Sequence, residues 1–415
     1  MTSRSTLLRL LTEACELEHG LACSYLFSAM TLKREPDGDR LLAVESPLVR
    51  QWAAQLYFIA SQEMLHLAQA WNLLSALGGT PYYLRPNFPQ NTKYYPLHLK
   101  LALEPYGVRS LERFIAYEKP FELLAEHRFV QDAAQPRAAD GDAFRTIGEL
   151  YRLLEKGITE LPNAIVGDPA AQVGPDLVDF PDIVRVTDLE SAQRAIGLVT
   201  HQGEGSATDR ADCHFGIFLG LRDALLREKQ RNPHFEPAHR TISNPTTDVS
   251  EEYGAPRGTL IANAYSRDVA KAFDALYSLM LRMLGYTFSP GGSEPLRKAF
   301  GQGAILLMAT VLKPLGEVLA QLPATEEGTA GPPFGLTRHV LLPLDARSAL
   351  SSVAGRLDEL TATLADLSAS PHAIPGIARV AASLQRLHST DGLELPADGR
   401  FKDSASITHR QMEVL

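Results

Sequence analysis

The apolar residues of this chain recur mostly at intervals of three and four positions, the period of an amphipathic α-helix. Long helical patterns cover about residues 5–32, 46–77, 143–161 and 188–205. Alternation of apolar and polar residues, which is typical of a half-buried strand, is almost absent. Two of the patterns are long for a globular helix, and this length suits the staves of a bundle. The pattern therefore predicts an all-α fold built on a four-helix bundle.

Shorter helical patterns surround and follow these four. They lie at about 97–103, 110–117, 209–229, 267–286, 294–322, 346–369 and 374–388. We interpret residues 1–230 as the bundle, 231–262 as a linker and 263–415 as an additional C-terminal helical region. The length of 415 residues suits two helical domains or one domain with a large extension. We expect the last two patterns, 346–369 and 374–388, to form either a lid or a dimer surface. If they form a dimer surface, the protein is a homodimer.

The net charge and the length of the apolar stretches limit which kinds of partner the protein can bind. The formal net charge of −9 argues against nucleic acid, which selects a basic stripe. The longest apolar stretch, 303–312, is about half of what a bilayer span needs, so no membrane is expected. The three cysteines form no CxxC pair and are interpreted as reduced thiols. With no signal-peptide pattern at the N-terminus, we expect a cytoplasmic protein that acts on a small-molecule substrate.

Glu63 and His66 are the first candidate chemistry. Three residues apart on a helix, they share a face. Leu56, Ile59 and Ala70 belong to the same stripe, so the carboxylate lies among apolar neighbours. Such a placement is costly unless a cation or a partner compensates it. The spacing by itself fits either a metal-binding pair or a satisfied pair in the core.

The first helical pattern contains a similar intrusion. Glu18 interrupts an apolar face that includes Leu17, Leu21 and Ala22. Tyr25, two turns later on this face, is a candidate for a hydrogen bond to the same site and is our first catalytic candidate.

The third and fourth long patterns supply further candidates. Glu149 lies beside the apolar stripe of the third pattern. Glu204 stands between two glycines at the end of the fourth, where a local helix break would direct it inward. His201 shares a face with Glu204, and His214 can join them if the chain folds back. Together with Glu18, Glu63 and His66, these positions match a bundle in which two helices each give a Glu and two give a Glu–His pair. Carboxylates with imidazole favour two iron ions, with manganese as the alternative, over zinc.

Several stretches together resemble the ferritin-like domain of the iminophenyl-pyruvate dimer synthase family, best known from violacein-type pathways. The stretches are ELEHGLACSY at 16–25, IASQEMLH at 59–66, NLLSALGGTP at 72–81, FIAYEKP at 114–120, IGELY at 147–151, AIGLVTHQGEG at 195–205, the pair His214-Phe215 and NPT at 244–246. The similarity covers about residues 5–290 and leaves out the additional large region of that family's best-known members.

The resemblance implies a ferritin-like fold and a non-haem iron site. Carried onto this chain, the metal ligands it implies are Glu18, Glu63, His66, Glu149, Glu204 and His214. His201 departs from the family pattern and is our second catalytic candidate, interpreted as an extra ligand or a substrate contact. Glu118 belongs to the family pattern, and we interpret it as structural because Lys119-Pro120 follows it at a helix end.

These observations predict an enzyme, a non-haem di-iron oxidase or oxygenase that uses O2 or peroxide. Its expected substrate is a small amino-acid-derived metabolite in natural-product biosynthesis. Oxidative coupling of imino acids, as the family resemblance implies, is the alternative within catalysis. Iron storage and a non-catalytic helical interaction protein are the alternatives outside it.

Overall fold

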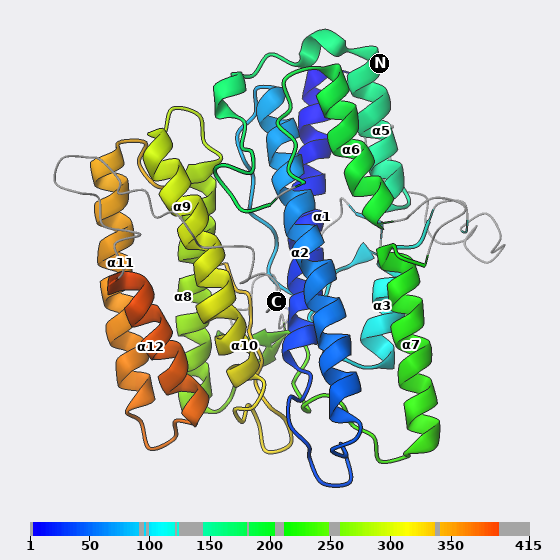
Figure 1. Ribbon diagram of the computed structural model, residues 1–415, viewed down its shortest axis with the longest axis vertical. Coiled ribbons are helices and arrows are strands. Elements are labelled where there is room, and N and C mark those ends of the chain that lie inside the picture. Colours follow the sequence, from blue (N-terminus) through cyan, green and yellow to red (C-terminus); the bar gives the residue numbers. More distant parts are fainter. Residues whose placement is uncertain are drawn as a thin grey trace. The chain divides into compact units, whose positions relative to one another are not determined.

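The protein is described by a computed structural model that is mostly helical. The described residues are 3–90, 95–96, 99–120, 123, 144–180, 182–203, 211–248, 258–336 and 341–389. The chain forms two compact units (Figure 1). Unit 1 comprises residues 1–172 and 183–239, and unit 2 comprises 173–182 and 240–415. The change of unit after residue 239 falls inside the segment that we interpret as a linker.

Two long helices, α1 (Arg4–Met30) and α2 (Ser46–Ala76), pack side by side and form the central pair of unit 1. The Ser3 side chain accepts the Thr6 N–H and so begins α1 with a side-chain cap. The Pro residue in the first turn of α2 costs no helix hydrogen bond there. Gly78 ends the run with a φ of 75°, which a residue with a Cβ rarely adopts.

The other two staves of the bundle are each made of two shorter helices. They are α3 (Val108–Tyr117), α5 (Ile147–Glu160), α6 (Leu189–Gly203) and α7 (His214–Arg231). Figure 1 shows α5 and α6 along one half of the long pair, and α3 and α7 along the other half. Helix α3 packs on α7, and α5 packs on α6. Both interruptions therefore lie near the middle of the bundle.

One predicted helix is wrong. Residues 97–98 lie outside the described part of the chain, and 100–105 form neither helix nor strand. Leu101 and Leu103 are fully buried, and the Lys100 carbonyl accepts the Tyr117 hydroxyl proton. Burial in this segment and side-chain hydrogen bonds to its backbone replace the bonds that a helix would have provided.

Unit 2 is also helical. Its helices are α8 (Ala264–Thr287), α9 (Glu294–Leu307), α10 (Lys313–Leu319), α11 (Ala346–Ser368) and α12 (Pro375–Ser389), with a π-helical turn at Met308–Leu312 and a two-stranded parallel pair, β1 (Pro245–Thr246) with β2 (Thr259–Leu260). Helix α8 packs on α9, α10 and α11 and buries Phe273 and Leu276. The stretch Glu294–Leu319 is long and apolar enough to cross a membrane, but half of its most apolar window is buried within the protein.

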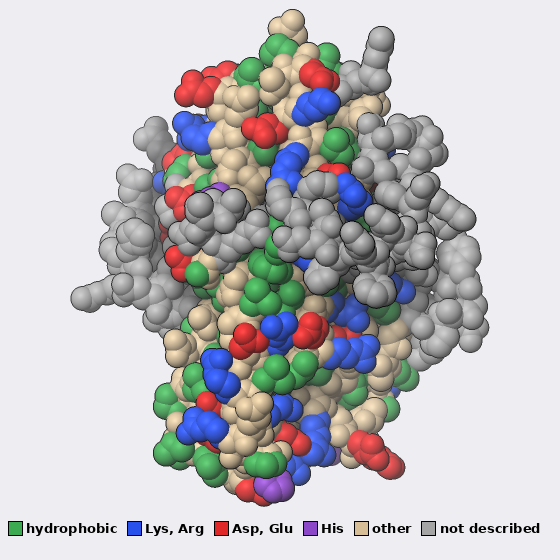
Figure 2. All heavy atoms as spheres, turned by 90° about the vertical axis from the view of Figure 1, so that its right-hand side faces the viewer, with side chains coloured by type: hydrophobic (Ala, Val, Ile, Leu, Met, Phe, Trp, Pro, Cys, Tyr) green, Lys and Arg blue, Asp and Glu red, His purple; other side chains and the backbone are tan. Residues whose placement is uncertain are grey.

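Acidic and basic side chains are interspersed on the face seen in Figure 2. The surface visible there shows no region of a single sign of charge among its described residues.

Candidate metal centre

Five buried titratable side chains meet near the middle of the unit 1 bundle. Glu18 comes from α1, Glu63 and His66 from α2, Glu118 from the residue that ends α3, and His214 from the first position of α7. Each of them is at most 5% exposed. The interruptions of the two broken staves thus place one carboxylate and one imidazole beside those of the long helices.

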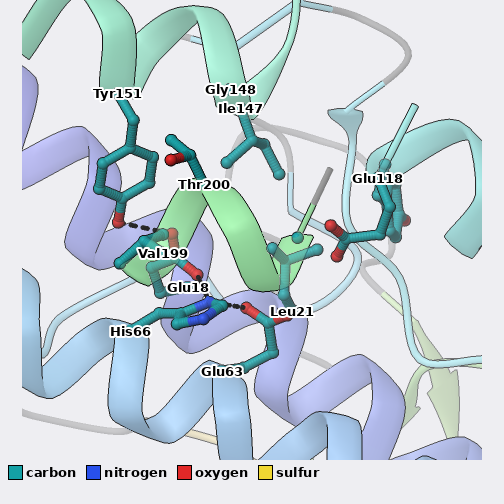
Figure 3. A pocket seen from close by; sticks show the side chains of 12 residues that line it. Glu18, Leu21, Glu63, His66, Glu118, Ile147, Gly148, Tyr151, Val199 and Thr200 are labelled. Atoms are coloured by element: carbon teal, nitrogen blue, oxygen red, sulfur yellow. Dashed lines mark hydrogen bonds and ion pairs between the residues drawn. The ribbon is translucent and has the colours of Figure 1, made fainter. Parts of the chain in front are cut away.

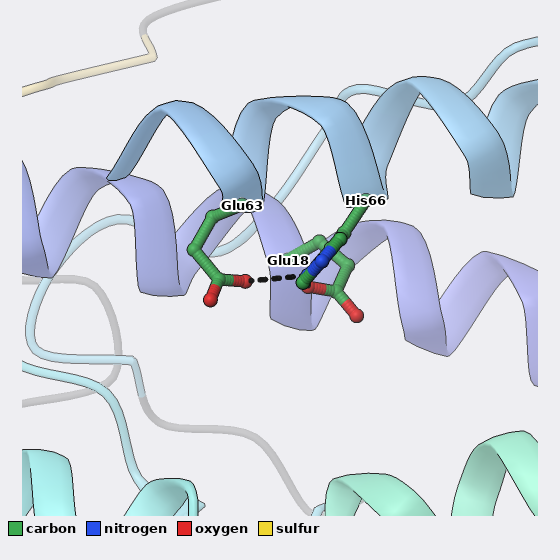
Figure 4. A group of neighbouring side chains, drawn as sticks. All are labelled: Glu18, Glu63 and His66. Atoms are coloured by element: carbon green, nitrogen blue, oxygen red, sulfur yellow. Dashed lines mark ion pairs between the residues drawn. The ribbon is translucent and has the colours of Figure 1, made fainter. Parts of the chain in front are cut away.

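Three of these side chains form a first ligand group, shown in Figure 4. The Nδ1 atom of His66 lies 3.5 Å from Oε2 of Glu18 and 3.4 Å from Oε2 of Glu63. One ligand atom from each residue falls within 4.8 Å of the others. Helical spacing brings Glu63 and His66 to one face, and the packing of α1 on α2 adds Glu18.

A second ligand group shares Glu63 with the first. Its members are Glu63, Glu118 and His214, whose ligand atoms also lie within 4.8 Å of one another. The Nδ1 atom of His214 lies 2.7 Å from Oε1 of Glu63 and 3.7 Å from Oε1 of Glu118. The two imidazole rings lie nearly parallel, with centroids 5.6 Å apart. Glu63 therefore offers one carboxylate oxygen to each histidine.

Two tyrosines hydrogen-bond the outer carboxylates. The Tyr151 hydroxyl of α5 donates to Oε1 of Glu18 at 2.6 Å, and the Tyr25 hydroxyl of α1 donates to Oε1 of Glu118 at 2.5 Å. Both tyrosines are fully buried. Each ligand group thus has one carboxylate whose orientation is held by a phenol.

Burial and mutual charge shift the pKa values of the cluster. Burial raises the pKa of Glu18 to about 8. Burial also opposes ionisation of Glu63, but the adjacent rings of His66 and His214 outweigh it and hold the pKa of that carboxyl below its ordinary value. Burial opposes charging of the two rings as well, but Glu63 above all raises the pKa of His66 well above its ordinary value and that of His214 to about 9. Protons therefore neutralise this cluster when no metal does so.

The donor set fits a pair of metal ions. Oε2 of Glu18 and both carboxylate oxygens of Glu63 are buried and lack a well-aligned hydrogen-bond donor in the described part of the chain. Buried carboxylate oxygens normally have such donors or bind a cation. Carboxylate oxygens with imidazole nitrogens, and no thiolate, match the ligand preferences of iron and manganese.

A cavity reaches the cluster from one side (Figure 3). Glu18, Glu63, His66 and Glu118 line its polar part. The remaining lining is mostly apolar or small: Leu21, Tyr117, Ile147, Gly148, Tyr151, Val199, Thr200 and Gly203. This cavity therefore brings apolar surface up to the carboxylates.

The structure brings together four of the six predicted metal ligands, Glu18, Glu63, His66 and His214. Tyr25 lies beside them and hydrogen-bonds a member of the second group. Glu204 lies outside the described residues.

Glu149 and His201 belong to neither ligand group in the described part of the chain. The structure does not bring Glu149 to the cluster, because this residue lies in the first turn of α5 and accepts the Arg145 backbone N–H at 2.6 Å. Its attraction to the helix N-terminus explains that position. His201 is exposed in the last turn of α6 and joins neither ligand group.

Glu118 is the ligand candidate that our structural interpretation of the sequence missed. It is 5% exposed and belongs to the second group. A signal was available, because Glu118 continues the stripe of Leu111 and Phe114 at helical spacing, as Glu63 continues its own stripe. Two glutamines that contact the histidines, Gln62 and Gln202, were also missed. Gln62 lies in the middle of α2 and Gln202 near the end of α6, and neither position has a distinct pattern in the sequence.

Comparison with known proteins gives matches at several levels. A family model described as ferritin-like matches residues 11–223. Dichlorochromopyrrolate synthase from Lentzea aerocolonigenes is 25% identical over 371 residues, which cover 81% of this chain and 36% of that protein. 2-Imino-3-(indol-3-yl)propanoate dimerase from Chromobacterium violaceum is 26% identical over 359 residues, which cover 80% of this chain and 34% of that protein. The chain thus spans about a third of the length of these curated relatives.

A crystal structure of a ferritin-like protein from Caulobacter vibrioides is also similar. Its sequence identity is 18% and its TM-score 0.49, with 79% of this chain and 97% of that chain covered.

Proposed function

The chain belongs to the ferritin-like family, and from this premise we propose that it is a non-haem di-iron oxidoreductase of natural-product biosynthesis. In this proposal Glu18 and His66 would hold one iron, Glu118 and His214 would hold the other, and Glu63 would be available to both. Manganese is the alternative metal, because the same ligands suit it.

One observation carries the proposal, namely the pair of buried ligand groups that share Glu63. A single buried Glu–His pair occurs in many cores as a satisfied ion pair. Here three carboxylates and two imidazoles converge, and three of the buried oxygens have no well-aligned donor among the described residues. Such a cluster is costly in a protein interior unless cations compensate it.

The bound metal pair would supply the electrons that reduce O2 or peroxide. The protein's own part is to orient the ligands and to exclude water. Tyr25 and Tyr151 keep their protons, because burial above all raises their pKa values well above the ordinary value, so each remains a hydrogen-bond donor to its carboxylate. Leu21, Ile147 and Val199 line the cavity with apolar surface and limit the water that reaches Glu18 and Glu118.

The substrate class that we propose is a small amino-acid-derived metabolite. It is supported by the two curated relatives, which are named for chromopyrrolate synthesis and for dimerisation of an indolyl imino acid. Because this chain spans about a third of their length, the relatives guide the choice of compounds to test and do not set the reaction.

We also propose a cytoplasmic location. It is supported by the three cysteines, which are buried and form no disulfide in the described part of the chain, as expected in a reducing compartment.

The test is substrate-dependent O2 consumption by the iron-loaded protein, with aromatic and aliphatic 2-imino acids as the first compounds. We expect consumption by the parent and by Glu149→Ala, and none above background by Glu63→Ala. Iron uptake of many ions per chain without substrate-dependent O2 use would contradict the proposal and indicate storage. A parent that binds no metal would contradict both readings and indicate a helical interaction protein.

A further inference from the structure

Both histidines of the cluster direct the same ring nitrogen inward. Nδ1 faces the carboxylates in His66 and in His214. The other nitrogen of each ring meets a glutamine. Nε2 of His66 donates to Oε1 of Gln202 at 2.8 Å, and Nε2 of His214 donates to Oε1 of Gln62 at 3.0 Å.

A hydrogen bond at Nε2 determines whether Nδ1 has a lone pair with which to bind a metal. A neutral imidazole carries one proton, and only the nitrogen without it can bind a metal. A carbonyl oxygen accepts and cannot donate, so a glutamine oxygen keeps the proton on Nε2. The lone pair is then on Nδ1, the nitrogen that faces Glu18 and Glu63 in one ring and Glu63 and Glu118 in the other.

Each glutamine also joins two elements of the bundle. Gln62 precedes Glu63 on α2 and contacts His214 of α7, whereas Gln202 lies near the end of α6 and contacts His66 of α2. Each ligand group therefore has one histidine whose ring is oriented from a different helix. Both glutamines are partly exposed, and both rings are at most 2% exposed.

The acceptors are also neutral. A carboxylate on the outer nitrogen of a metal-binding histidine increases the electron density of the ring and makes it a stronger ligand. An amide oxygen does this much less. The negative charge of the two groups is therefore confined to Glu18, Glu63 and Glu118, and each imidazole is a neutral, moderate ligand.

Resting on the proposed di-iron function, we propose that Gln62 and Gln202 are positioning residues, one for each metal. They fix the two histidines with Nδ1 available to the metal, and their neutrality favours the divalent state of the centre over the trivalent state.

The first test removes the acceptors and uses Co(II) alone as the probe. Gln202→Leu is expected to weaken one of two Co(II) binding steps by about 10- to 100-fold, and Gln62→Leu to weaken the other by a similar factor. Gln193→Leu on α6 and Gln55→Leu on α2 are the controls, because they are partly exposed glutamines of the same helices outside both groups. Both controls should keep both steps within about twofold of the parent, since they lose no contact to a histidine.

The second test keeps an acceptor and adds a charge. Gln202→Glu and Gln62→Glu should restore the Co(II) affinity that the Leu variants lose. In the iron-loaded protein they should lower the midpoint potential of the Fe(III)/Fe(II) couple, measured by redox titration. If a Leu variant fails to fold, the two Glu variants still test the proposal.

The outcomes separate the inference from the function on which it rests. A parent that binds two Co(II) ions, with Leu variants that match their controls, would overturn the positioning role and leave the metal centre intact. Glu variants with an unchanged potential would overturn the effect of neutrality. A parent that binds no metal would overturn both the inference and the proposed function.

Discussion

Glu63 is placed so that its two oxygens face different histidines, and this makes it unlike the other carboxylates of the cluster. Oε1 lies 2.7 Å from Nδ1 of His214, and Oε2 lies 3.4 Å from Nδ1 of His66. Glu18 and Glu118 each belong to one group and each accept a tyrosine hydroxyl. Loss of Glu63 should therefore affect both metals, whereas loss of an outer carboxylate should affect mainly one.

Glu118 and Glu149 provide a matched pair of test sites, because the structure places Glu118 in a ligand group and the sequence pattern had suggested Glu149 instead. Glu118→Gln should weaken the binding of one metal by about tenfold or more, since loss of a ligand should cost at least as much as loss of its hydrogen-bond partner. Glu149→Gln should leave both steps unchanged, because Glu149 accepts the Arg145 N–H in the first turn of α5 and lies outside both groups. Titration with Co(II), followed by its visible absorption, measures both steps. Equal losses in the two variants, or a loss only in Glu149→Gln, would contradict the assignment.

Metal binding should become tighter as the pH rises from about 6 to 9. The pKa of Glu18 is raised to about 8 and that of His214 to about 9, so both carry a proton at neutral pH that a metal must displace. Below these pKa values protons compete with the metal, and above them the competition ends. Calorimetric titration in buffers of different ionisation enthalpy should detect proton release at pH 7 that declines towards pH 9. Uptake without proton release at pH 7 would show that the ligands are already deprotonated.

The sequence allowed us to predict those candidate metal ligands that interrupt a long apolar stripe. Glu18, Glu63 and His66 could be predicted because a buried carboxylate at a core position needs a partner. Glu118 also continues an apolar stripe, but the Pro that follows its neighbour favoured the interpretation of this position as an ordinary helix end. The pattern at Glu149 was ambiguous, because a Glu beside a stripe also suits a helix N-terminus, where the structure places it.

At the scale of elements, the interrupted staves are what bring the second group into place. α3 ends at Tyr117, so that Glu118 follows its last turn, and α7 begins at His214. The sequence predicted the two long helices closely, because their apolar period continues over many turns. It predicted α3 and α7 as helices outside the four staves, because pattern and propensity do not show which helices align end to end in a bundle.

Two glycines of unit 1 test the packing around these elements. A Cβ on Gly167 would lie 2.1 Å from the backbone oxygen of Ser75 near the end of α2, and we expect Gly167→Ala to destabilise the fold by about 1–3 kcal/mol. Gly197 on α6 has nothing within 4 Å of such a Cβ. Gly197→Ala should stabilise by about 1 kcal/mol through helix propensity. Urea unfolding measures both, and a neutral Gly167→Ala would contradict the close approach to Ser75.

At the scale of the whole molecule, the chain combines a unit that has a candidate metal centre with a second helical unit. Among the described residues, both ligand groups belong to unit 1. The apolar period indicated the helical character of both units, and the polar segment between them indicated a division of the chain. The sequence could not show that residues 173–182 belong to unit 2, since such a crossing depends on tertiary packing.

Metal loading should stabilise the chain through the unit that binds it. Without metal, the cluster retains three buried carboxylates close together, and a ligand that binds only the folded state adds about 2.7 kcal/mol at 100 times its dissociation constant. Calorimetric unfolding with and without Co(II) should show a transition that moves upward in the parent and does not move in Glu63→Ala. An equal upward shift in Glu63→Ala would place the stabilising ion elsewhere.

The most direct test of the account is the metal content of the protein. Elemental analysis after expression in iron-supplemented medium would compare the parent with Glu63→Ala and with Glu149→Ala. Because the two ligand groups share Glu63, we expect about two irons per chain in the parent and in Glu149→Ala. We expect Glu63→Ala to lose both irons. Substoichiometric metal that is the same in all three proteins would contradict the dinuclear centre and with it the proposed function.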